Sequence, residues 1–534
     1  MSDNTNDPAA DTLNPHDINA VVAARRAKLK NICDLGIDPW GQRFDGRSFI
    51  GEIRARQYEI KFKTSAGELI DAPEFVEGLD MRSWKQERGG GDLVGPAVRA
   101  AGRIVLHRDT GKLQFIDIQD WTGTIQLFVG KNQVGEENWK LIENLDLGDL
   151  IGVDGELKMT MRGELSIFAE KIYLLTKTIE PPPAKHVGLV DPELRQRLRY
   201  IDLAYNAESR QRFLNRTKIV QSIRRTLDEN QFVEIEGPTL HSIAGGAAAR
   251  PFETFHNALG MNLFLRIALE LHLKRLMVGG LERVYELGRV YRNEGISPRH
   301  NPEFTMLEVY QAFGDYKSMM DLTESLIANA SKAIGLGTQI SWGEQQLDIS
   351  IPFARRPYHE LLAEHTGVDP FAERALKDYA QAIGLTVAGK HIDVIKNEIF
   401  EERVEEKLVG PVFVTDYPAS ICPLTKRKQD DPTIAERFEL FVCGIELANA
   451  YTELNDPDLQ QKLFKTQLAG LPAEESMAKM DHDFVRALRN GMPPAGGLGV
   501  GIDRLVMLLT NSQSIRDVIL FPLLRAETGN PEHE

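Results

Sequence analysis

The sequence predicts an α+β fold of two domains, a five-stranded β-barrel followed by a larger domain that contains antiparallel strands. Its 534 residues exceed the size at which one hydrophobic core stops growing, about 250–300 residues. Five short alternating strand patterns occur between residues 98 and 176. Downstream, strand-like runs at 283–291 and 304–313 enclose a polar loop, which indicates two neighbouring strands that run in opposite directions.

Composition and cysteine usage indicate a cytoplasmic protein. Hydrophobic residues make up 42% and charged residues 26% of the chain, and no apolar run approaches the roughly 18 residues of a membrane span. Residues 1–18 are polar and acidic, so we expect a disordered tail and no secretory signal, with a second tail at 528–534. Cys33, Cys422 and Cys443 are odd in number and widely separated, which argues against a disulfide framework or a cysteine zinc site.

The charge gives little support to a nucleic-acid partner. The net charge is −15, and neither a DNA nor a membrane partner is expected. Net charge is a poor guide, however, in a large protein that contacts RNA over one face. The basic stretches at 25–30 and 210–225 are either such contacts or solvated helix faces.

The barrel is preceded by a helix and an irregular extension, together residues 19–97. The helix covers 19–35, where Val21, Val22, Leu29 and Ile32 lie opposite the basic cluster, and Gly36 ends it. Residues 44–95 suggest no function.

The strands between 98 and 178 predict an OB-fold, because a helical segment at 136–144 falls between the third and fourth strands. The open face of such a barrel commonly binds oligonucleotides. Phe115 and Gln126 lie on neighbouring strands, and Glu164 begins the last one. Phe115 either stacks on an unpaired base or belongs to the barrel core. The predicted strands are 98–106, 113–118, 124–129, 150–157 and 164–175.

A linker at 179–196 follows, and three consecutive prolines at 181–183 make it stiff and extended. The second domain is expected at 197–527. It opens with a long helix at 208–230, in which Ile219, Ile223 and Leu227 form one buried stripe.

The polar loop at 292–304 gathers groups suited to anions. Arg292 and Glu294 would share one face of a strand, Arg299 and His300 follow in the loop, and Phe304 opens the return strand. Guanidinium groups bind carboxylates and phosphates. The loop could therefore hold a nucleotide beside a carboxylic acid; the alternative is a surface hairpin with an ion pair.

These stretches carry a resemblance to a known family. Residues 292–304 resemble motif 2 of the class II aminoacyl-tRNA synthetases, 497–504 (GLGVGIDR) resemble motif 3, and 232–238 (FVEIEGP) resemble motif 1. Residues 245–252 (GGAAARPF) and the run 446–457 narrow the match to the class II lysyl-tRNA synthetases. The resemblance covers nearly everything after about Arg99.

The resemblance implies an antiparallel catalytic sheet flanked by helices and a homodimer formed by motif 1 around Pro238. It also implies that the chain attaches L-lysine to tRNA(Lys) through a lysyl-adenylate, with Mg²⁺ bound alongside ATP. Arg292 and Arg504 would be catalytic, Glu439 and Glu446 would bind the metal, and Phe115, Gln126 and Glu164 would contact the anticodon. The ATP-binding residues would be Arg292, Glu294, Arg299, His300, Asn301, Phe304, Glu439, Glu446 and Arg504. Without the resemblance, Glu439 and Glu446 could be two exposed glutamates of a sheet.

Lysine recognition requires carboxylates inside an apolar channel. Alternation places Glu308 and Tyr310 on one strand face. The carboxylates would repel one another, so we expect the empty pocket to be strained or hydrated. Leu269 stands where the resemblance leads us to expect proline. The resemblance assigns lysine binding to Gly246, Glu270, Arg292, Glu308, Tyr310, Asn449, Tyr451 and Glu453.

Three alternatives remain at this stage. The aspartyl and asparaginyl synthetases share both domains, although an aspartyl pocket would present cations toward the side chain. A lysyl-synthetase paralogue that modifies a protein lysine lacks the anticodon-binding barrel. A non-catalytic RNA-binding relative would lose groups that bind ATP, yet Arg292, Glu294, Glu439, Glu446 and Arg504 are all present.

Overall fold

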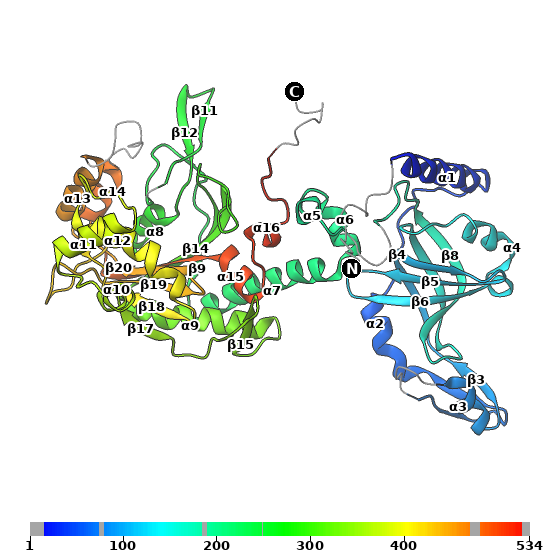
Figure 1. Ribbon diagram of the computed structural model, residues 1–534. Coiled ribbons are helices and arrows are strands. Elements are labelled where there is room, and N and C mark those ends of the chain that lie inside the picture. Colours follow the sequence, from blue (N-terminus) through cyan, green and yellow to red (C-terminus); the bar gives the residue numbers. More distant parts are fainter. Residues whose placement is uncertain (1–14, 74–79, 184–188, 248, 470–480, 526–534) are drawn as a thin grey trace, which may run out of the picture. The chain divides into compact units, whose positions relative to one another are not determined.

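The computed structural model describes residues 15–73, 80–183, 189–247, 249–469 and 481–525. The expected tails lie largely outside these ranges, as do part of the expected linker and Ala248. The chain divides into two compact units, one ending at Arg210 and the other beginning at Gln211 (Figure 1). All three cysteines are free. None of the helices in the described ranges combines the length and the apolar character that a bilayer crossing requires.

The first unit contains a closed barrel with strand order β4-β5-β6-β8-β7. Helix α4 connects the third strand to the fourth, so the predicted OB-fold is confirmed. This helix begins at Lys131 rather than at the expected residue 136, and a kink at Gly135 (φ 79°) explains why the early turn was missed. The barrel elements are β4 (Ala97–Asp109), β5 (Leu113–Gln119), β6 (Thr124–Gly130), α4 (Lys131–Ile142), β7 (Leu150–Met159) and β8 (Leu165–Thr176).

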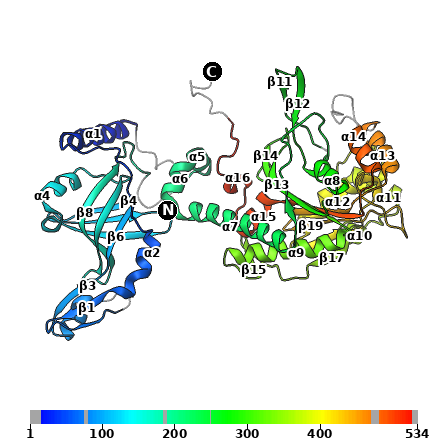
Figure 2. The same cartoon turned by 180° about the vertical axis from the view of Figure 1, so that it is seen from behind.

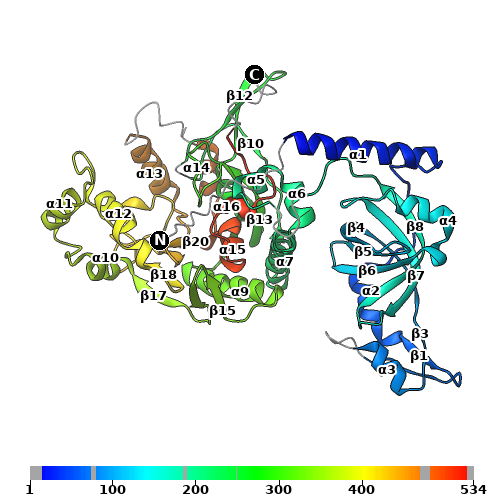
Figure 3. The same ribbon diagram turned by 45° about the vertical axis from the view of Figure 1, so that its right-hand side comes forward.

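The extension before the barrel packs onto it. Figures 2 and 3 show α1 at one end of the barrel and a small sheet, of order β2-β1-β3, at the other. Phe62 and Leu93 of this sheet share a hydrophobic core with Leu157 of the barrel. At the opposite end, Arg25 donates to the carbonyls of Leu147 and Thr178. The elements are α1 (Pro15–Asp34), α2 (Ile50–Ala55), η1 (Arg56–Glu59), β1 (Lys61–Thr64), β2 (Leu69–Asp71), α3 (Met81–Glu87) and β3 (Gly91–Val94).

The second unit is built on an eight-stranded sheet of order β17-β18-β19-β20-β21-β14-β13-β9. All neighbours pair antiparallel except the two outermost pairs, β17 with β18 and β13 with β9. The expected antiparallel sheet is therefore confirmed. Its strands are β9 (Val233–Glu234), β13 (Arg283–Tyr291), β14 (Glu303–Ala312), β17 (Ala354–Pro357), β18 (Val412–Thr415), β19 (Arg437–Val442), β20 (Ile445–Thr452) and β21 (Ala495–Gly501).

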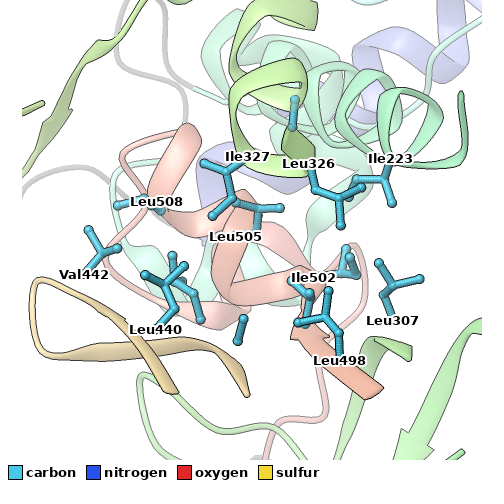
Figure 4. Close-up of a cluster of buried hydrophobic side chains, with 14 of the residues drawn as sticks. Ile223, Leu307, Leu326, Ile327, Leu440, Val442, Leu498, Ile502, Leu505 and Leu508 are labelled. Carbon is cyan, nitrogen blue, oxygen red and sulfur yellow. The ribbon is translucent and has the colours of Figure 1, made fainter. Parts of the chain in front are cut away.

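Helices cover this sheet. The predicted stripe on α7 is confirmed, since Ile219, Ile223 and Leu227 are buried in the main core. Figure 4 shows Ile223 of α7 and Leu326 of α9 directed toward the same core as the strand residues Leu307 and Leu498. Helices α8 and α14 pack into a separate cluster beside β13 and β14.

The remaining elements are helical or form short sheets. The helices are α5 (Pro192–Arg197), α6 (Arg199–Tyr205), α7 (Ala207–Glu229), α8 (Glu270–Val278), α9 (Tyr316–Ala333), α10 (Tyr358–Thr366), α11 (Glu373–Ala382), α12 (Ile392–Arg403), α13 (Pro457–Ala469), α14 (His482–Arg489), α15 (Ile502–Leu509) and α16 (Ile515–Val518), with short η2 (Glu405–Lys407) and η3 (Ala419–Ile421). The strands are β10 (Leu240–His241), β11 (Glu253–His256), β12 (Met261–Leu265), β15 (Gln339–Trp342) and β16 (Gln345–Asp348).

Candidate active site

A pocket of about 450 Å³ lies on the second unit, over strands β14, β20 and β21 and the start of α15. This volume falls in the range that holds a small ligand or cofactor. Of the residues expected to bind ATP and lysine, all but Glu439 and Glu453 line it: Gly246, Glu270, Arg292, Glu294, Arg299, His300, Asn301, Phe304, Glu308, Tyr310, Glu446, Asn449, Tyr451 and Arg504. The structure thus brings together segments that are far apart in the sequence.

The floor of the pocket depends on strand alternation and on glycine. Phe304, Glu308 and Tyr310 alternate along β14 and all line the pocket. On β21, a Cβ added to Gly497 would lie 1.8 Å from Glu453 Oε1 and 2.7 Å from Tyr310 Cε1. Because the side chains of Glu453 and Tyr310 pack directly against the backbone of Gly497, no side chain fits at that position.

A turn, rather than strand alternation, brings Arg292 and Glu294 together, and that part of the prediction is wrong. Strand β13 ends at Tyr291, and the Glu294 N–H donates to the Arg292 carbonyl at 2.9 Å. The Arg292 guanidinium lies 5.2 Å from the centre of the Phe304 ring. Its burial lowers the pKa of Arg292, although a guanidinium remains charged at any physiological pH.

The motif 2 loop is held against motif 3 by side chains. Arg504 Nη2 lies 3.2 Å from His300 Nε2, and Ser297 Oγ lies 2.9 Å from His300 Nδ1. Since Arg504 can only donate, His300 must accept at Nε2 and carry its proton on Nδ1. Burial and the charge of Arg504 lower the pKa of His300, which favours this neutral form. Arg299 Nη1 ties the loop to the carbonyl of Gly444 at 2.9 Å.

Glu308 is a buried carboxylate that lines the pocket. Its Oε1 accepts the Leu269 N–H at 3.0 Å and its Oε2 accepts the Tyr310 hydroxyl at 3.1 Å. Burial, with a contribution from the charge of Glu270, raises the pKa of Glu308 to about 7. Leu269 supplies an N–H that the proline expected at this position would lack.

A buried cation beside the pocket, Lys274, was not predicted from the sequence. Lys274 Nζ donates to Glu270 Oε1 at 2.5 Å and forms an ion pair with Glu453, and both Lys274 and Glu453 are completely buried. The Tyr451 hydroxyl donates to Glu270 Oε2 at 3.0 Å. Lys274 therefore offsets part of the repulsion expected between the carboxylates of Glu270 and Glu453. The spacing of Glu270 and Lys274, four residues apart on one helix, was the available signal.

The two glutamates expected to bind metal occupy different environments on the β19–β20 hairpin, whose Cys443-Gly444 turn has positive φ at both residues. Glu446 lines the pocket, and its Oε2 lies 3.4 Å from Arg504. Glu439 is not among the lining residues; it pairs with Arg437 and accepts the Tyr417 hydroxyl at 2.7 Å.

The charge of Glu446 reinforces the burial that raises the pKa of Glu439. Among the described residues, no group of three or more histidine, cysteine, aspartate or glutamate side chains is arranged to hold a metal by itself.

A second candidate site lies on the outer face of the barrel. Phe115 is half-buried there, outside the barrel core, and it meets Phe128 edge to face at 5.6 Å. Phe128 in turn stacks on Phe168 at 4.4 Å, so three strands present a row of phenylalanines. Gln126 Oε1 accepts from Ser166 Oγ at 3.1 Å, and Glu164 is exposed just before β8. Sequence reasoning missed Phe128 and Phe168, although they alternate with buried residues as Phe115 does.

Comparisons with known proteins agree with this geometry. Residues 191–525 match the family of tRNA synthetases class II (D, K and N), and residues 98–175 match the OB-fold nucleic acid binding domain. A lysine–tRNA ligase of Bacillus subtilis (strain 168) is 45% identical over 517 residues, covering 96% of this chain and 98% of the relative. The chain belongs to the class II lysyl-tRNA synthetases.

Other relatives support the same assignment. A lysine–tRNA ligase of Bacillus anthracis is 44% identical over 520 residues, covering 96% of this chain and 99% of the relative, and one of Bacillus mycoides (strain KBAB4) is 43% identical over 520 residues. The predicted family, fold class and ligase activity are confirmed. The aspartyl, asparaginyl and non-catalytic alternatives are not favoured.

Proposed function

We propose that the enzyme activates L-lysine with ATP and then transfers the lysyl group from lysyl-adenylate to the 3′ end of tRNA(Lys). In the first step a lysine carboxylate oxygen bonds to the α-phosphorus as the bond to pyrophosphate breaks. The supporting observation is the juxtaposition, in one pocket, of Glu270 and Glu308 with Arg292 and Arg504. Such a site neutralises both the cationic amino acid and the anionic triphosphate.

On the nucleotide side, we assign Arg292 to bridge the lysine carboxylate and the α-phosphate. Phe304 would stack on adenine from one side and Arg504 would cover it from the other, while Glu294 accepts from the adenine amino group. The short links from Arg504 to His300 and to the Glu446 carbonyl (2.8 Å) support a preorganised nucleotide site. Arg299 and His300 would bind the outer phosphates, with Asn301 completing the loop.

On the amino-acid side, we assign Glu308, Tyr310 and Glu453 to the ε-ammonium of lysine. Gly246 and Glu270 would bind the α-amino group. Asn449 would assist Arg292 with the carboxylate, and Tyr451 would line the stem. A neutral side chain such as that of leucine would leave these buried carboxylates unpaired, at a cost of several kcal/mol.

We propose that Mg²⁺ accompanies ATP. Carboxylate oxygens suit this ion, and the Glu446 carboxylate in the wall of the pocket is the observation that supports it. The metal would neutralise phosphate charge, and Glu446, at the pocket wall, is more accessible than Glu439.

The function is tested by ATP–pyrophosphate exchange with each proteinogenic amino acid in turn. We expect exchange with lysine alone. Exchange with aspartate or asparagine, and none with lysine, would contradict the proposal. The second step is then tested by acid-stable labelling of tRNA(Lys) with radioactive lysine.

Lysine binding should strengthen as pH rises through about 7. The pKa of Glu308 in the ligand-free pocket is raised to about 7, and the ε-ammonium binds only the ionised form, so lysine must displace a proton at lower pH. Below that pH we expect the KM for lysine to rise by up to about tenfold per pH unit. The measurement is the KM for lysine and, as a control, for ATP between about pH 6 and about pH 8.5. A lysine KM that is flat in pH would contradict the assignment of Glu308.

We propose that Phe115 stacks on the central anticodon uridine, which Gln126 and Glu164 also contact. Stacking is worth about 1–3 kcal/mol per base, so Phe115→Ala should raise the KM for tRNA by roughly 5- to 150-fold. Lysine-dependent pyrophosphate exchange should stay unchanged, because the barrel has no part in activation. Tyr58→Ala, at an exposed aromatic side chain of the same unit, serves as control. Equal tRNA kinetics in both variants would refute the assignment.

We further propose a homodimer formed by the motif 1 region around Pro238. Strand β9 is an edge of the eight-stranded sheet, and exposed apolar side chains occur at Val233 and Leu240 on either side of that proline. An exposed apolar sheet edge favours pairing with a second chain. Since its tRNA substrate serves translation, we also propose a cytoplasmic location.

A further inference from the structure

We propose that Lys274 is a resident counter-ion of the lysine pocket, whose ammonium occupies one part of the carboxylate cluster and thereby fixes how much positive charge the substrate must supply. This inference rests on the proposed lysine-binding site and deepens it. Lys274 is a positioning and specificity-determining residue, since it acts through Glu270 and Glu453.

The geometry places Lys274 among pocket groups. It projects from α8, is fully buried, and bonds to one oxygen of Glu270 from its own helix. It also pairs with Glu453, the residue directly after β20, and lies 5.6 Å from the centre of the Tyr451 ring. A buried ammonium with two carboxylate partners is fixed in place. Glu270 therefore keeps one oxygen, the acceptor of the Tyr451 hydroxyl, on the pocket side.

Lys274 meets carboxylates from its own helix and from the end of β20. The adjoining pocket wall carries Glu308 and Tyr310 of β14, Tyr451 of β20, and Arg292 after β13. On the α14 side, Asp481 and Asp483 pair instead with Arg275, at 2.7 and 3.2 Å. Lys274 thus interacts with Glu270 and Glu453, and Glu308 completes the carboxylate cluster through its proximity to both of them.

Charge balance follows from this cluster. Bound lysine carries an α-ammonium and an ε-ammonium, and together with Lys274 these match the carboxylates of Glu270, Glu308 and Glu453. The carboxylate of the substrate is matched by Arg292. Without Lys274 the loaded pocket would hold one unmatched buried carboxylate, which would take up a proton or lose its orientation.

The test compares Lys274→Met, Glu453→Gln and the double variant in the full-length enzyme, by lysine-dependent pyrophosphate exchange across pH. Lys274→Met should raise the lysine KM about tenfold or more at neutral pH and move the pH dependence of that KM upward. The ATP KM should not change. Adding Lys274→Met to Glu453→Gln should lower the lysine KM relative to Glu453→Gln alone, because it removes a cation that repels the substrate. Lys332→Met, at an exposed lysine of α9, is the matched control.

If Lys274→Met and Glu453→Gln change the lysine KM independently and additively, and its pH dependence does not shift, Lys274 only fills space. That result would overturn the inference. If Lys274→Met does not fold, the comparison of Glu453→Gln with the double variant decides alone: equal or weaker lysine binding in the double variant overturns it. Glu308→Gln distinguishes an error in the proposed lysine pocket from an error in the counter-ion role of Lys274. If that variant leaves the lysine KM unchanged, the proposed pocket is wrong. If it raises the KM while the Lys274 variants act additively, only the counter-ion role is wrong.

Discussion

Replacing Arg504 with alanine is expected to lower lysine-dependent pyrophosphate exchange by about 10²–10³-fold while the fold survives. Arg504 donates to the Glu446 carbonyl at 2.8 Å and lies 3.2 Å from His300 Nε2, so it joins the motif 2 loop to the β19–β20 hairpin. Its loss removes a fixed positive charge from the nucleotide site and, at the same time, the partner of His300 Nε2. Preorganised charge of this kind contributes most in a site that excludes water.

The measurement combines exchange rates with thermal unfolding. Arg489→Ala removes an exposed arginine of α14 in the same unit and should leave exchange at the wild-type rate. Wild-type exchange in Arg504→Ala, with an unchanged melting temperature, would refute the assignment of the ATP site.

Replacing Glu308 with glutamine should raise the KM for lysine by about 10²-fold or more. Removing one partner of a buried ion pair costs about 3–5 kcal/mol, and about 1.4 kcal/mol corresponds to a factor of ten. Glutamine keeps an acceptor for the Leu269 N–H but offers no charge to the ε-ammonium. The KM for ATP should hardly change, because Arg292 and Arg504 remain.

Glu303→Gln provides the matched control, since Glu303 lies on the same strand with its side chain 52% exposed. Both variants are assayed by exchange at saturating ATP. A lysine KM in Glu308→Gln equal to that of the control would show that the ε-ammonium binds elsewhere.

Much of the site was predictable from patterns that extend over only a few residues. Alternation along β14 placed Glu308 and Tyr310 on one face, and the structure joins them by a hydrogen bond of 3.1 Å. The helical stripe of α7 and the positions of the five barrel strands along the chain were likewise predictable, because hydrophobic periodicity and turn punctuation act over a few residues. The resemblance to the family supplied the remaining nucleotide-site residues.

Other features required the tertiary structure. Arg292 and Glu294 meet through a turn after β13, which alternation does not describe. The helical spacing of Lys274 and Glu270 is visible in the sequence, but the pairing of Lys274 with Glu453 is not, since that contact forms only when α8 packs beside the sheet. Residue order alone thus specified strand faces, the helical stripe and the family. Which buried charges neutralise one another depended on long-range packing, because electrostatic pairing is set by distance in space and by exclusion of water.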